Sequence, residues 1–261
     1  MLKVTFLGTG TSQGIPIIGS THPVCLSNDP KDKRLRVSVL ISWEDHQIVI
    51  DCGPDFRQQM LRAEVDHIDG VLFTHDHADH TAGLDDIRPF CFRQGALPFY
   101  ASTEVFTALE QRFSYIFQSE NKYPGAPTVA KKIIHKNIPF KVGNKTIIPI
   151  EAIHYRMPVL GFRIDNFAYL TDVKELAEDQ LGFLHDLDVL VLNALREEEH
   201  PSHLNLEQAL ALVEILAPKK AYFTHISHLL GFHSEVSKRL PQHVELAYDT
   251  LTLKIPSSHA E

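Results

Sequence analysis

The chain has 261 residues, 44% of them hydrophobic, which is enough to bury one large core, so we expect a single domain spanning residues 1–261. A formal charge of −8 and a pI near 6.0 exclude a generally basic surface, so long nucleic acid is not an expected partner. The chain has only three cysteines and does not begin like a secretory leader, so we expect a cytoplasmic protein. It has no apolar run near 20 residues, so we do not expect it to span a membrane.

Short β-type runs and amphipathic stretches alternate along the chain. In the first half they predict strands at residues 2–7, 37–41, 47–50, 70–74 and 98–101 and helices at 54–65 and 104–117. In the second half they predict strands at 132–135, 145–154, 160–164, 167–170, 189–192, 221–224 and 244–255, with a helix at 174–185.

One further helix, at residues 206–216, has the clearest local signals. Asn205 can cap it, Gln208 follows three positions later, and apolar residues recur at helical spacing. Two β-rich halves that each carry helices predict two sheets packed face to face with helices on their outer faces. The expected fold is therefore an α/β four-layer αββα sandwich.

Histidine is unusually frequent, with 16 residues, and three of them lie in the stretch HDHADH at residues 75–80. In an extended segment His75 and His77 point to the same side and can hold one ion. A turn into a helix then brings Asp79 and His80 towards a second ion. The alternative is a set of surface histidines on a loop.

Four ligands do not complete two metal sites, so further ligands must lie downstream. Strand ends are the places to look, because loops at the ends of strands carry functional side chains. His154, Asp172 and His225 each follow a predicted strand. Each alone is more often structural, but together with the HDHADH stretch they predict a dinuclear centre.

With these residues in place, the chain resembles the metallo-β-lactamase superfamily over essentially its whole length. The segments FLGTGTS (6–12), DCGPDFR (51–57), GLDDIR (83–88) and THISH (224–228) resemble its cyclic ribose phosphate phosphodiesterase branch. The resemblance implies a sandwich of the metallo-β-lactamase type and two divalent ions, manganese or zinc. It implies that one ion is held by His75, His77, His154 and Asp172 and the other by Asp79, His80, Asp172 and His225, with Asp172 bridging.

Charge favours an anionic substrate. Two divalent ions with Asp79, Asp172 and a bridging hydroxide would leave about one net positive charge, which matches a phosphodiester. His200 and His203, ahead of the helix at 206–216, could each supply a proton. The resemblance favours His203, which with Asp79 makes up the expected catalytic pair. Asp51 could orient a metal-bound histidine or be an ordinary turn aspartate.

The resemblance also implies a structural zinc site, from which this chain departs. Relatives place Cys-x-Cys-x-x-Cys after the glycine-rich loop, whereas here Ser20 and His22 precede Cys25, and His228 stands in the completing position. A serine hydroxyl is a poor zinc ligand, so His22, Cys25 and His228 would bind zinc with a fourth ligand or the site is lost.

The resulting hypothesis is a dinuclear hydrolase that cleaves a small, anionic phosphodiester such as a cyclic phosphate. A homodimer is an open possibility for its assembly. Three alternatives remain: a tRNA 3′-end endonuclease, which would add a basic arm not evident here; a lactone or thioester hydrolase; and a non-catalytic metal-binding regulatory module, which would lack a ligand.

Overall fold

The computed structural model of the protein describes residues 1–118 and 120–256, whose strands form two seven-stranded sheets. The first has the order β14 (Thr252–Ile255), β1 (Leu2–Gly8), β2 (Ser38–Trp43), β3 (His46–Ile50), β4 (Gly70–Leu72), β5 (Leu97–Ala101) and β6 (Val129–Ile133). The second has the order β13 (Val244–Leu246), β12 (Lys220–Thr224), β11 (Val189–Asn193), β10 (Phe167–Tyr169), β9 (Met157–Ile164), β8 (Lys145–His154) and β7 (Phe140–Val142).

Both sheets are built in the same way. Strands β3 to β6 are parallel in the first sheet, as are β10 to β13 in the second, and the remaining pairs are antiparallel. Parallel neighbours bring their carboxyl ends to one edge of a sheet, which is where open α/β sheets bind ligands. The predicted metal ligands follow strands of these two parallel regions and of β8.

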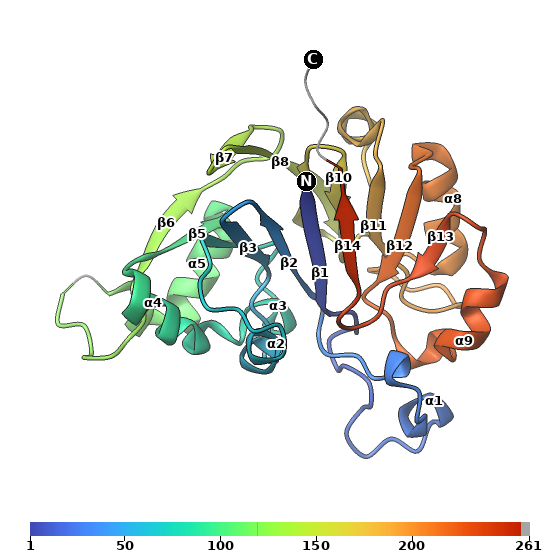
Figure 1. Ribbon diagram of the computed structural model, residues 1–261, viewed down its shortest axis with the longest axis horizontal. Helices are drawn as coiled ribbons and strands as arrows, with labels where there is room; N and C mark the ends of the chain where they lie inside the picture. Colours follow the sequence, from blue (N-terminus) through green and yellow to red (C-terminus); the bar gives the residue numbers. More distant parts are fainter. Residues whose placement is uncertain (119, 257–261) are drawn as a thin grey trace.

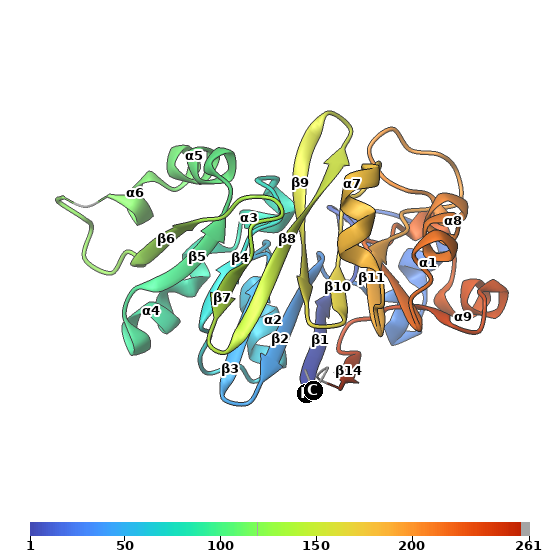
Figure 2. The same ribbon diagram turned by 90° about the horizontal axis from the view of Figure 1, so that it is seen from above.

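Helices cover the outer faces of the two sheets (Figures 1 and 2). On the first sheet lie α2 (Phe56–Arg62), α4 (Arg88–Gln94), α5 (Thr103–Arg112) and α6 (Ser114–Phe117). On the second lie α7 (Glu178–Leu181), α8 (Leu206–Leu216) and α9 (His233–Val236). The predicted αββα sandwich is confirmed.

Three apolar clusters hold the layers together. One lies between the sheets and includes Phe6, Phe162 and Tyr169, all fully buried or nearly so. The other two fill the space between each sheet and its helices, around Phe56 and Phe99 on one side and around residues of β11 and α8 on the other. Burial of apolar surface on both faces of each sheet fixes the strand ends and the loops that follow them.

Local signals predicted some elements well and others wrongly. The strand at 145–154 and the helix at 206–216 have the predicted bounds. The predicted helix at 174–185 is wrong over its first half, because the amides of Lys174 and Glu175 both donate to the carbonyl of Ile153 and keep the chain extended beside β8. Only α7 and the 3₁₀ turn Gly182–Leu184 are helical there.

The single final strand predicted at 244–255 is also wrong. The segment divides into β13 and β14, which belong to different sheets. Asp249 lies between them and accepts hydrogen bonds from the Thr9 hydroxyl at 2.8 Å and the Leu35 amide at 2.9 Å. These long-range bonds turn the chain from one sheet to the other. Across the described ranges, no helix combines the length and the apolar character that crossing a bilayer requires.

Candidate metal centre

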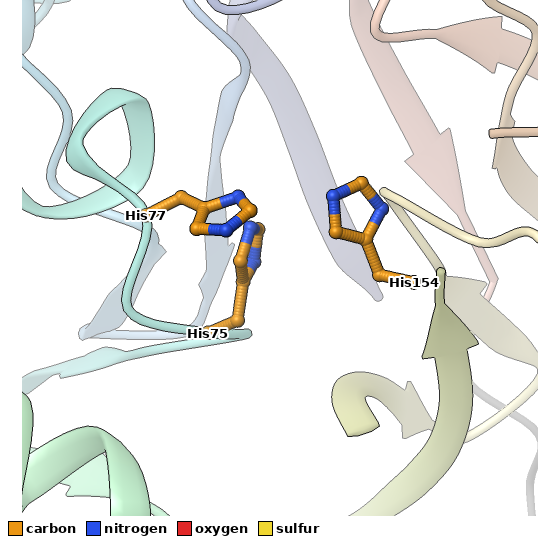
Figure 3. Close-up of side chains that lie close together, drawn as sticks. All are labelled: His75, His77 and His154. Atoms are coloured by element: carbon orange, nitrogen blue, oxygen red, sulfur yellow. The ribbon is translucent and has the colours of Figure 1, made fainter. Parts of the chain in front are cut away.

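The HDHADH stretch lies directly after β4 and runs into the short helix α3 (Ala78–Thr81). His75 and His77 are in the loop, and His154 is the last residue of β8. Donor atoms of these three histidines lie within 4.8 Å of one another. Figure 3 shows His75 and His77 on one side of a common space and His154 on the other, with their rings turned towards it.

A second group adjoins the first. Asp79 and His80 of α3 meet His225, which follows β12, with donor atoms again within 4.8 Å. Asp172 stands between the groups: its Oδ2 lies 3.3 Å from His80 Nε2, and its Oδ1 lies 3.3 Å from His225 Nε2. A carboxylate oxygen of Asp172 also lies within 4.8 Å of a ring nitrogen of His75. The structure thus brings all seven predicted ligands into one cluster.

Three residues of this region have left-handed backbone conformations. Asp51 (φ 63°), Asp172 (φ 60°) and His225 (φ 54°) each come just after a strand of the parallel regions. A non-glycine residue in this conformation costs roughly 1–3 kcal/mol and persists where the surrounding structure imposes it. The shared conformation turns each side chain at the strand end towards the cluster.

Outer hydrogen bonds fix the orientation of three of the histidine rings. Asp51, fully buried, lies 2.7 Å from His80 Nδ1 and accepts hydrogen bonds from the amide and hydroxyl of Thr74. His75 Nδ1 lies 3.0 Å from the same hydroxyl, and His154 Nδ1 lies 2.8 Å from the carbonyl of Ser202. In each pair the contact through Nδ1 leaves Nε2 for the cluster, the usual arrangement of metal-bound histidines. Asp51 is therefore an orienting residue rather than an ordinary turn aspartate.

Close backbone packing explains why the segment after Asp51 contains a glycine. A Cβ atom on Gly53 would lie 2.0 Å from the Asp79 carbonyl oxygen. The Cys52 amide donates to the carbonyl of His80 at 2.8 Å. A side chain at position 53 would push α3, and with it Asp79 and His80, away from the segment that follows β3.

The charged groups of the cluster stabilise one another. Burial alone would raise the pKa of Asp172, but His225 and His80 hold it well below its usual range. Burial disfavours protonation of His80, yet Asp172 and Asp51 raise its pKa above the ordinary value. The pKa of His75 is lowered by burial. Asp172 is thus ionised and His75 neutral, the forms in which both can coordinate a metal.

The donor set fits divalent cations. The Nε2 atoms of His75, His80 and His225 are buried and have no hydrogen-bond partner within the described residues. Buried polar atoms are seldom left unsatisfied in folded proteins, and each such atom calls for an explanation such as an ion. Imidazole nitrogens and carboxylate oxygens in this number suit manganese, zinc or iron.

His203 lies over the cluster, where the loop before α8 brings it. Its Nδ1 is 3.8 Å from Asp172 Oδ1, and its ring centroid is 4.6 Å from that of His154 and 4.8 Å from that of His225. Burial, with His225 nearby, lowers the pKa of His203 to about 2 against the opposing effect of Asp172. His200 is only partly buried, and its Nδ1 lies 3.1 Å from the Ser202 hydroxyl.

A pocket of about 430 Å³ opens beside the cluster, against His77 and His154. The two-residue turn between β8 and β9 lines it with Tyr155 and Arg156, and the Arg156 guanidinium lies 5.0 Å from the centre of the Tyr155 ring. Sequence patterns alone did not identify these residues. The available signal was their place in a tight turn directly after the predicted ligand His154.

The three candidate structural-zinc ligands are only partly brought together. The rings of His22 and His228 meet edge to face with centroids 4.8 Å apart. Cys25 is buried beside Ile15 in a small apolar cluster. Among the described residues, no group of three donor atoms within 4.8 Å includes these side chains. The structural zinc therefore remains a prediction.

Comparison with known proteins gives a consistent family. Residues 46–226 match the model of the beta-lactamase superfamily domain. The crystal structure of a diphosphatase from the PhnP family superposes with a TM-score of 0.92 at 37% identity, covering 98% of this chain and 99% of that one.

Two curated relatives match over less of their own length. The octanoyltransferase of Porphyromonas gingivalis is 39% identical over 252 residues, which are 96% of this chain and 51% of that protein. The ribonuclease Z of Methanosarcina acetivorans is 31% identical over 122 residues, 44% of this chain and 35% of that protein. The chain thus spans about half the length of the first and a third of the second.

Proposed function

Because this chain belongs to the metallo-β-lactamase superfamily and to the PhnP family within it, we propose that it is a dinuclear metal-dependent hydrolase that cleaves a small phosphodiester. The observation that carries the proposal is the convergence of the buried, unpartnered Nε2 atoms of His75, His80 and His225 around the carboxylate of Asp172. Cyclic phosphates and nucleotide-like diesters are the substrate class proposed.

In this proposal His75, His77 and His154 hold one ion, and Asp79, His80 and His225 hold the other. Asp172 would serve both ions, because its oxygens lie 3.3 Å from His80 and His225 of the second group and within 4.8 Å of ring nitrogens of His75 and His154 in the first. Two manganese or zinc ions bound here would offset the charge of the diester and lower the pKa of an attacking water molecule. Asp51 and Ser202 keep the rings of His80 and His154 directed at the ions.

His203 is proposed to hold the proton that the leaving oxygen needs. Its imidazole is neutral in the protein alone, because burial lowers its pKa to about 2. A negatively charged diester beside the ring favours the protonated form, since an opposite charge within hydrogen-bonding distance raises a histidine pKa. Substrate binding would therefore supply the condition under which His203 can act as a general acid.

The pocket beside His77 and His154 supports a compact, anionic substrate. Its volume of about 430 Å³ lies towards the lower end of the range for small-molecule sites. Arg156 stacks on Tyr155 and makes no ion pair within the ranges that the structure describes. An unpaired guanidinium at the rim of a cationic centre favours negatively charged ligands.

An acyl ester or thioester hydrolase is the second candidate. The relative from Porphyromonas gingivalis is named for transfer of an octanoyl group, and it matches nearly the whole of this chain. That match leaves about half of the relative's own length unaccounted for, so the acyl chemistry can belong to either half. The same metal centre can activate a water molecule for attack on a carbonyl carbon.

A substrate panel tests the proposal. Protein loaded separately with manganese and zinc would be assayed with bis(p-nitrophenyl) phosphate, a 2′,3′-cyclic nucleotide, a lactone, an acyl thioester, a β-lactam and a precursor tRNA. We expect the two small phosphodiesters to give the highest kcat/KM and chelation to abolish their turnover. A higher kcat/KM on the lactone, the thioester or the tRNA would contradict the proposed substrate class.

A further inference from the structure

Two histidines of the cluster lack the outer hydrogen bond described for the other three, and His77 is the exposed one of the two. His77 is exposed, and its ring makes no hydrogen bond within residues 1–118 and 120–256, whereas His75, His80 and His154 each use Nδ1 in an outer contact. His225 also lacks such a contact, but it is almost fully buried and so is confined by its surroundings. The placement of His77 must therefore come from the backbone that carries it.

That backbone is held from the neighbouring layer by Arg112, the last residue of α5. Nη1 of Arg112 donates to the carbonyl oxygen of Asp76, which belongs to the peptide group that joins Asp76 to His77. Nη2 donates to Asp76 Oδ2 at 3.0 Å. The two bonds fix the plane of the peptide directly before the ligand.

Thr81 of α3 holds the same loop from the other side. Its hydroxyl lies 2.9 Å from the carbonyl of His77 and 3.3 Å from that of Asp76. This contact is local, four or five residues along the chain. Arg112 is 36 residues away in sequence, so its bonds to Asp76 tie the loop to the helix layer over the first sheet.

We propose that Arg112 is a positioning residue for the metal centre, which sets the place of His77 by clamping Asp76 and thereby tunes the affinity of the ion held by His75, His77 and His154. The inference rests on the proposed dinuclear function. Arginine suits the task because its planar guanidinium can bond a carbonyl and a carboxylate together, which an ammonium group does less well. Loss of groups that orient metal ligands typically weakens metal binding by about 10–100-fold.

Cobalt(II) titration of metal-free protein, followed by visible absorption, tests the proposal without an activity assay. In the wild-type protein we expect two binding steps. In Arg112→Ala one step should weaken by about 10-fold and the other stay unchanged. Arg112→Lys should recover part of the loss.

The matched control is Glu110→Ala, on the same helix, which removes an exposed ion pair with Lys131 and leaves the loop untouched. It should titrate as the wild type does. Unchanged affinity at both steps in Arg112→Ala would overturn the clamp, as would an equal loss at both steps. A wild-type protein that shows a single step would instead contradict the dinuclear centre itself, so the two failures are distinguishable.

Discussion

The metal-ligand cluster and the N-terminal segment around His22 and Cys25 both contain side chains of the kinds that bind metals, but they differ in how those side chains are held. In the cluster, Asp51 and Ser202 bond the outer nitrogens of His80 and His154 and direct the inner ones at a common point. In the N-terminal segment, Nδ1 of His22 accepts a hydrogen bond from the Val24 amide at 3.3 Å. His22 thereby caps the short helix α1 (Pro23–Leu26).

We infer from this difference that ligand-type residues are ready to bind a metal where the rest of the fold orients their rings. His22, Cys25 and His228 have suitable chemistry, and two of them touch, yet within the described part of the chain no outer carboxylate directs them as Asp51 directs His80. The cluster is prepared for metal by the protein itself.

Replacing the shared carboxylate should have the greatest consequence. We expect Asp172→Ala to reduce hydrolysis of a phosphodiester to the detection limit and to lower the content of both ions, because Asp172 lies against His80 and His225 of one group and against His75 and His154 of the other. Metal analysis and turnover measure this. Asp186→Ala, an exposed aspartate with a similar φ of 56°, is the control and should stay active. Full activity and two bound ions in Asp172→Ala would rule out a bridging role.

Removing the proposed acid should lower the rate while sparing the metals. We expect His203→Ala to reduce kcat by a factor on the order of 10²–10⁴ with normal metal content. The loss should shrink for a nitrophenolate leaving group, which barely needs a proton. His200→Ala, the partly exposed neighbour, should have little effect. An equal loss with good and poor leaving groups would argue against proton donation by His203.

Weakening an outer contact should have an intermediate effect. Asp51→Asn keeps the shape but removes the charge that faces His80 Nδ1 at 2.7 Å, so metal affinity should fall by about 10–100-fold. Equilibrium dialysis against zinc would measure the change. Asp55→Asn, which breaks an ion pair with Arg36 outside the cluster, provides the reference. If both variants bind zinc as the wild type does, the outer contacts do not prepare the cluster.

Replacing Cys25 in the N-terminal segment should change metal content and melting temperature least. If the structural zinc is retained, wild-type protein holds about one zinc more per chain than Cys25→Ser and melts at a higher temperature. Cys91→Ser controls for the loss of a buried thiol, since Cys91 is also buried but lies on α4. Equal zinc content and equal melting temperature in wild type and Cys25→Ser would show that this chain has lost the site.

Local sequence signals predicted what depends on neighbours in the chain. The helix at 206–216 is defined by its own ends, since Asn205 and Gln208 form a reciprocal capping box. The candidate ligands, which the structure brings together, were predicted from the spacing of the HDHADH stretch and from strand ends that local patterns reveal. The fold class followed from the alternation of strands and helices, and its family type from motifs that the chain shares with relatives.

Features that depend on distant contacts could not be predicted in this way. The extended conformation at Lys174 and Glu175 comes from bonds to Ile153, about twenty residues earlier. The bond from Arg112 to Asp76 joins residues 36 positions apart, and the spacing of apolar residues along the chain does not predict it. Asp51 lies 29 residues before His80, so sequence alone left its role open.

We propose that the cluster around Asp172 holds two divalent ions and that turnover needs both. Metal-free protein would be titrated with manganese while hydrolysis of bis(p-nitrophenyl) phosphate and bound metal are measured in the same samples. We predict that activity is absent without metal and rises until two ions are bound per chain. Full activity at one ion per chain, or activity that survives complete removal of metal, would contradict the account.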